Sequence, residues 1–110
     1  MQKTDKMKII RNNIIPFKGF KALNLFGILF VRKDANIGAL TINHEEIHTR
    51  QMKELLYIFF YVWYVSEWIV RLFMKGNAYK NICFEKEAFD NDTDMNYLKY
   101  RKPYSFLKYL

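Results

Sequence analysis

The sequence has very little cysteine, the residue whose disulfides are typical of proteins outside a reducing compartment. Cys83 is its one cysteine, so no disulfide can form within the chain. A reducing compartment is typical of such a sequence. The first residues, MQKTDKMKIIRNNIIPF, contain no apolar run like the core of a secretory signal. We therefore expect a cytoplasmic protein.

Acidic residues, repeats and low-complexity stretches are also scarce. There are 11 Asp and Glu against 18 Lys and Arg, which gives a formal charge of +7. A basic surface suits acidic peptides, nucleic acid or a membrane face. No nucleic-acid motif accompanies the charge, so we attribute it mainly to solubility and expect no nucleic-acid partner.

With 110 residues, half of them hydrophobic, residues 1–110 are expected to form one small domain that gains from a staple such as a metal.

The chain lacks an uncharged apolar run long enough to span a membrane. The segment LLYIFFYVWYV, residues 55–65, has no charge, but an extension to Met74 includes Glu67 and Arg71. A span needs about 20 largely apolar residues, and a run of about 10–14 is more typical of a buried core helix. We expect a core or interfacial helix here. The alternative is a membrane-associated module anchored by residues 55–74, either peripheral or with a single span.

Hydrophobic periodicity predicts an α+β fold with short N-terminal strands followed by about three helices. Pro16 and Gly19 bracket a predicted turn, and KALNLFGILFVRK predicts a hairpin or two short strands that end near Arg32. From about Ile37 the period becomes helical. The predicted helices run from 37 to about 55, from there to about 74, and from 79 to 91, followed by a basic and aromatic tail at 101–110.

The motif NHEEIHTRQ, residues 43–51, contains the only two histidines of the chain. On a helix, His44 and His48 lie next to each other on one face and can bind one zinc ion. Glu45 lies at the edge of that face, where it can act as general base on a water. The histidines share a stripe with Leu40 and Leu55, which predicts that they point inward. An exposed helix with two incidental histidines is the alternative.

A catalytic zinc needs a third protein ligand and one open position. Cys83, Glu85 and Glu87 are the possible donors on the third predicted helix. Glu85 and Glu87 are two residues apart, so they project to nearly opposite sides of that helix. The face around Glu85 is the more apolar, and an inward carboxylate needs a partner. We predict Glu85 as the third ligand, with Glu87 as the alternative.

HEEIH, followed about one helical hairpin later by FEKEAF, resembles the gluzincin metallopeptidases. The short chain is most similar to the minimal, single-domain minigluzincins and to the peptidase domains of bacterial antibiotic-sensor transducers. The resemblance covers roughly residues 20–100. It implies a zincin-like fold and a zinc peptidase in which Glu45 is the base. It also implies a peptide or protein substrate aligned along FGILFVRK as the edge strand.

The sequence departs from the family pattern at two places. Phe89 stands four residues after Glu85, where many members have an aspartate that supports a ligand histidine. No histidine is left to stabilise an oxyanion, so a catalytically inactive, zinc-stabilised domain is an alternative function. We also predict that the tail covers the cleft and holds the enzyme latent. Residues that could support the ligands are Asn43, Gln51, Asp90 and Asp92, and those that could stabilise an oxyanion are Tyr97 and Arg101, with Tyr79 and Tyr100.

Overall fold

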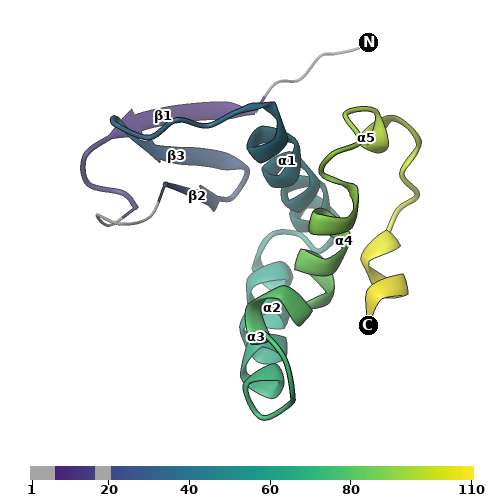
Figure 1. Ribbon diagram of the computed structural model, residues 1–110. Coiled ribbons are helices and arrows are strands. Elements are labelled where there is room, and N and C mark those ends of the chain that lie inside the picture. Colours follow the sequence, from purple (N-terminus) through teal and green to yellow (C-terminus); the bar gives the residue numbers. More distant parts are fainter. Residues whose placement is uncertain (1–6, 17–20) are drawn as a thin grey trace.

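The computed structural model describes residues 7–16 and 21–110, and within them the α+β class is confirmed. Three strands, β1 (Lys8–Asn12), β2 (Ala22–Leu25) and β3 (Ile28–Arg32), form one sheet. The sheet lies on one side of the molecule, and the helices make up the rest of it (Figure 1). The predicted turn between Pro16 and Gly19 lies largely outside the described residues.

Strands β2 and β3 are the two short strands that the sequence predicts. Leu25 pairs with Ile28, so the turn between them has two residues, Phe26 and Gly27. Both have positive φ, 53° and 88°, as a tight hairpin turn of this kind requires. Glycine adopts that conformation without strain.

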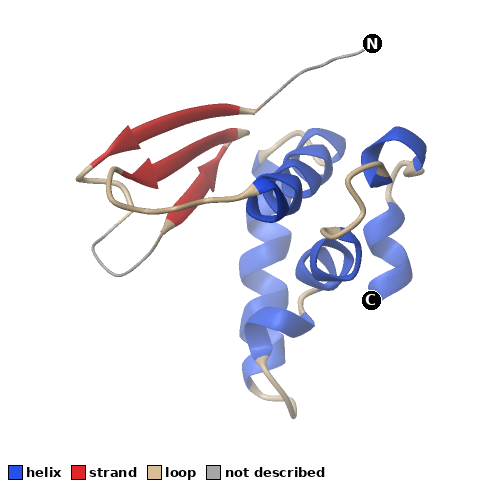
Figure 2. Ribbon diagram, turned by 45° about the horizontal axis from the view of Figure 1, so that its top comes forward, coloured by secondary structure: helices blue, strands red, loops and turns tan. Residues whose placement is uncertain are grey.

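The prediction that FGILFVRK is the edge strand is wrong. This segment forms β3, which lies in the middle of the sheet in the order β1-β3-β2 (Figure 2). The β-branched residues of β1 pair with β3 in parallel, and β2 pairs with it in antiparallel orientation. Both edges of β3 are therefore paired with other strands, and β2 is the edge strand nearest the helices.

Helix α1 (Ala39–Glu54) confirms the first predicted helix and its break near Leu55. Leu56 and Tyr57 have positive φ, and after them α2 (Ile58–Leu72) leaves at 111° to α1. The histidines of α1 are buried as predicted. Leu40, expected on the same inward stripe, is instead 47% exposed because it lies in the first turn, away from the core.

The third predicted helix is two helices. Ile82 has an extended backbone, with φ −64° and ψ 134°, and it separates α3 (Ala78–Asn81) from α4 (Cys83–Asn91). A short α5 (Tyr97–Tyr100) and a 3-10 helix, η1 (Ser105–Tyr109), complete the chain. The break at Ile82 turns α4 so that it packs against α1.

The main core lies between α1, α2, α4 and the C-terminal segment. Phe106 of η1 is 1% exposed and its ring lies 4.9 Å from that of Phe84. The tail is thus part of the core and lies against α4, and it contributes no residue to the cleft described below. The prediction that residues 101–110 cover the cleft is therefore wrong. The buried residues of this cluster are Met52, Phe60, Ile82, Cys83, Phe84 and Phe106.

The segment expected to be a core or interfacial helix forms α2, which packs on the core with only one side. Phe60 is its one buried residue. Among the described residues, no helix by itself has the length and apolar character to cross a membrane, although α1 and α2 meet those criteria as a bent pair.

Candidate metal centre

His44 and His48 of α1 meet Glu85 of α4 in a buried cluster. His44 Nε2 lies 3.1 Å from Glu85 Oε1, and His48 Nε2 lies 2.9 Å from the same oxygen. One ligand atom from each residue lies within 4.8 Å of the other two. The arrangement follows from the helical spacing of the histidines and from the first turn of α4, which directs Glu85 toward α1. The residues predicted as zinc ligands are therefore brought together.

The other ring nitrogens of the histidines are held by hydrogen bonds. His44 Nδ1 donates to Asp92 Oδ2 at 2.9 Å, and His48 Nδ1 donates to Gln51 Oε1 at 2.8 Å. Because the Nδ1 positions carry these protons, a neutral ring keeps its lone pair on Nε2, which faces a carboxylate oxygen. A cation between these three atoms would be a partner for all of them.

The donor set fits zinc. Two imidazoles and one carboxylate form a known catalytic zinc set, and the ligand atoms of a tetrahedral zinc lie about 3.3 Å apart. The two N–O distances of 3.1 and 2.9 Å are close to that separation. Cys83, the other possible donor, is buried in the core, where burial raises the pKa of its thiol.

Three of the four residues predicted to support the ligands lie at the cluster. Asp92 and Gln51 accept from the histidines, and Asn43 Nδ2 donates to the backbone carbonyls of Asp92 and Asp94, at 2.9 and 3.0 Å. Asp92, just beyond α4, therefore fills the role that Phe89 leaves open. The prediction is wrong for Asp90, which is exposed and accepts from Tyr109 instead.

Glu87 is not at the cluster, because the step of two residues turns it away from Glu85, as predicted. It accepts from Arg101 Nε and from Tyr97 OH, both at 2.5 Å, and from Gln51 Nε2 at 2.9 Å. Tyr97 and Arg101 are held there and do not line the cleft. Their predicted role in stabilising an oxyanion is therefore wrong, and so is the alternative ligand Glu87. Tyr100 is bonded to Asp94 at the surface.

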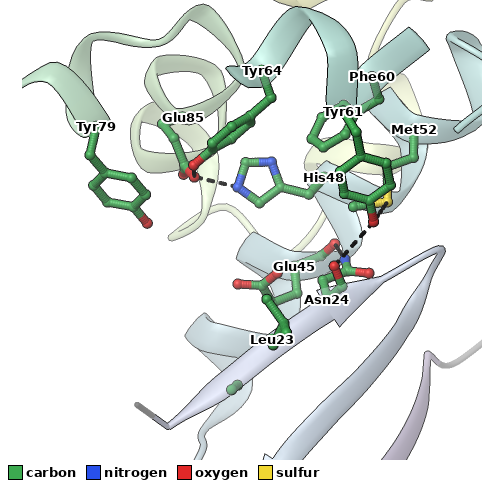
Figure 3. Close-up of a pocket in the computed structure, with 11 residues that line it drawn as sticks. Leu23, Asn24, Glu45, His48, Met52, Phe60, Tyr61, Tyr64, Tyr79 and Glu85 are labelled. Carbon is green, nitrogen blue, oxygen red and sulfur yellow. Dashed lines mark hydrogen bonds and ion pairs between the residues drawn. The ribbon is translucent and has the colours of Figure 1, made fainter. Parts of the chain in front are cut away.

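A cleft of about 300 Å³ opens beside the cluster (Figure 3). Glu45 is half-buried on its wall, next to His48 and opposite the edge strand β2. Strand β2 is positioned by Asn24, whose Nδ2 donates to the Glu45 carbonyl at 3.0 Å. The lining residues are Ala22, Leu23, Asn24, Glu45, His48, Met52, Phe60, Tyr61, Tyr64, Tyr79 and Glu85.

Tyr64 is a site residue that sequence reasoning missed. Its OH donates to Glu85 Oε2 at 2.6 Å, so it orients the carboxylate whose other oxygen faces the histidines. Tyr79, one of the residues that could stabilise an oxyanion, lines the same cleft. Burial and the carboxylate of Glu85 raise the pKa of both phenols, so both remain hydrogen-bond donors at neutral pH. The signal for Tyr64 in the sequence is its position four residues after the buried Phe60, which places both on one face of α2.

The His48–Glu85 pair gives the metal-free protein a defined pH dependence. Burial alone would lower the pKa of His48, but the charge and hydrogen bond of Glu85 outweigh it and raise the pKa from 6.5 to about 9. Burial opposes ionisation of Glu85 too, yet His48 and its hydrogen bonds hold that pKa well below 4.5. The stabilisation from the raised histidine pKa is therefore complete below about pH 6.5 and is lost as the pH rises through about 9.

We expect chelator-treated protein to lose on the order of 2 kcal/mol of unfolding free energy between pH 6.5 and 9.5. Urea unfolding at a series of pH values measures it. The variant His48→Gln keeps a polar side chain but cannot titrate, so its profile should be flatter over the same range. Parallel profiles for the two proteins would show that the pair does not have the proposed charge state.

Searches against protein-family models, the curated proteins and the solved structures find no match.

Asp92 offers a test of the centre that leaves all three proposed ligands in place. Asp92→Asn is expected to weaken zinc binding by about 10–100-fold, because it removes the carboxylate that orients His44. Competition with a chromophoric chelator measures the affinity. Asp90→Asn is the matched control, since Asp90 lies on the same segment but is exposed. Equal losses in the two variants would contradict a specific role for Asp92.

Proposed function

We propose that this chain is a zinc metallopeptidase with a zincin-like site of the gluzincin type. His44, His48 and Glu85 would hold the zinc, and Glu45 would be the general base. The observation that carries the proposal is the buried convergence of two imidazoles and a carboxylate at a cleft that also contains Glu45. A charged cluster of this kind is costly to bury unless the charges are paired or bind a metal.

Bound zinc would supply a Lewis acid that polarises a carbonyl group and lowers the pKa of water. The remaining chemistry belongs to the residues of the chain. Glu45 lies on the cleft wall beside His48, where its carboxylate can accept a proton from water and pass it to the leaving amine. Tyr79 keeps its phenolic proton and lines the same cleft, so it is the donor that we assign to the developing oxyanion.

The shape of the cleft favours an extended peptide as substrate. Ala22, Leu23 and Asn24 of β2 form one wall, and within the described residues the outer edge of β2 pairs with no other strand. An exposed edge can add a peptide through main-chain hydrogen bonds. Met52 and Phe60 line the same cleft and can contact an apolar side chain of such a peptide.

Zinc analysis combined with peptide hydrolysis tests the proposal. Purified wild type is expected to contain one zinc per chain and to cleave members of a peptide library, whereas His48→Ala should lose both properties. Circular dichroism checks that the variant is folded, and Met95→Ala, at an exposed position, is the control. Equal zinc in wild type and His48→Ala would refute the site. Zinc binding without hydrolysis of any peptide would instead indicate the non-catalytic, zinc-stabilised domain.

A further inference from the structure

Helix α2 has its charged residues on the inner side and apolar residues on the outer side, which is the reverse of an ordinary surface helix. Its charged residues, Glu67 and Arg71, lie on the side that packs against the protein, with side chains only 9% and 18% exposed. Glu67 accepts from Arg71, from the Trp63 indole and from the backbone of Cys83. The polar tip of Tyr64 also points inward, toward Glu85. The charged groups of α2 are therefore paired inside the molecule.

The outward side of α2 is apolar over its whole length. At 100° per residue the exposed positions cover more than half of the helix circumference, and Ser66 is the one polar residue among them. Figure 2 shows α1 and α4 in front of α2, and among the described residues no helix lies behind it. We call this surface the α2 face; its main residues are Ile58, Phe59, Val62, Val65, Ile69 and Leu72.

Exposed lysines flank helix α2 in the sequence at both of its ends. Lys53 lies just before α2, and Lys75 and Lys80 follow it, all three exposed. The acidic residues between positions 50 and 80 are Glu54 and Glu67, and each is paired with an arginine. Between positions 50 and 80, α2 is therefore flanked by exposed lysines, and both acidic residues are already paired with arginines.

We propose that the α2 face docks on a lipid bilayer that contains anionic headgroups. Large apolar patches with a polar border mark interaction surfaces. An interfacial helix inserts its apolar side below the headgroups while neighbouring lysines contact anionic lipid. Helix α2 has 15 residues and is about 22 Å long, which is shorter than the roughly 30 Å hydrocarbon core. It would lie along the surface.

A second copy of the chain fits this face less well than a bilayer does. In an antiparallel contact between two α2 faces, Lys53 of one copy would approach Lys75 of the other, and in a parallel contact each lysine would meet its own equivalent. Like charges would therefore come together, without a free carboxylate from the segment to offset them. Anionic headgroups complement the same lysines.

Sedimentation with lipid vesicles tests the proposal, with chelator present so that binding does not depend on the metal. We expect wild type to bind vesicles of phosphatidylcholine mixed with phosphatidylglycerol at least tenfold more tightly than pure phosphatidylcholine, and less tightly as salt rises. Trp68, 41% exposed on α2, should show a blue-shifted emission on binding. Lys53→Gln/Lys75→Gln should weaken binding to the mixed vesicles and reduce its salt dependence.

Val62→Glu/Ile69→Glu should reduce vesicle binding by at least about tenfold, because two charges enter the docked surface. Leu40→Glu/Met95→Glu is the matched control, since these apolar residues are similarly exposed but lie elsewhere. Thermal unfolding checks the fold of both variants. The proposal is overturned if folded wild type binds no vesicles, or if both double variants bind as wild type does. A dimer in light scattering that Val62→Glu/Ile69→Glu dissociates, without vesicle binding, would assign the face to a second copy.

Discussion

Replacing Glu45 by glutamine is expected to lower peptide hydrolysis by roughly 10²–10⁴-fold while zinc content stays at the wild-type level. The amide keeps the size of the side chain but cannot accept the proton of the attacking water. Glu45 is not among the three residues whose ligand atoms converge, so zinc should remain. The measurement is kcat/KM on a cleaved peptide, together with metal analysis of the same preparation.

Glu46→Gln is the control for Glu45→Gln because it makes the same chemical change one residue along the helix. Glu46 lines a different pocket, beside Phe26 and Thr49, so its replacement should leave hydrolysis within about twofold of wild type. Activity of Glu45→Gln equal to wild type would exclude the proposed base. Loss of zinc from that variant would show instead that Glu45 helps to hold the metal.

The residues of the metal cluster were predictable because their geometry is local to helices. The spacing of His44 and His48 fixes their common face, and the step between Glu85 and Glu87 allows only one of them to face the two histidines. Asp92 could be proposed only as one of several supports. The choice between Asp92 and Asp90 depends on where the chain leaves α4, and a helical pattern does not define that exit.

Other parts of the site depend on contacts between distant segments. Tyr64 reaches Glu85 because α2 leaves α1 at 111°, and that angle arises from positive φ at two non-glycine residues, Leu56 and Tyr57. The order of the strands depends on β1 pairing in parallel with β3, which no hairpin pattern reveals. Helical periodicity and the cost of burying a carboxylate thus predicted the three residues of the cluster, whereas the wall of the cleft could be found only from the tertiary fold.

The role of Arg101 also depends on contacts between distant segments and was not predictable from the sequence. Of the substitutions considered, its replacement should have the largest effect on stability. The Arg101 side chain is fully buried and joins Glu54, 2.7 Å from Nη1, to Glu87, 2.5 Å from Nε. Burial disfavours ionised Glu87, but hydrogen bonds from Arg101 and Tyr97 outweigh it and lower its pKa. Without the guanidinium, two carboxylates remain in or near the core with too few donors.

We expect Arg101→Met to lower the free energy of unfolding by roughly 3–5 kcal/mol, as measured by urea denaturation at neutral pH. Lys102→Met, the neighbouring exposed cation, should change it by less than about 0.5 kcal/mol. Adding Glu87→Gln to Arg101→Met should restore part of the loss, because it removes the unpaired buried charge. Gln51 bonds both Glu87 and His48, so Arg101→Met should also weaken zinc binding. A loss below about 1 kcal/mol would mean that water or another donor replaces the guanidinium.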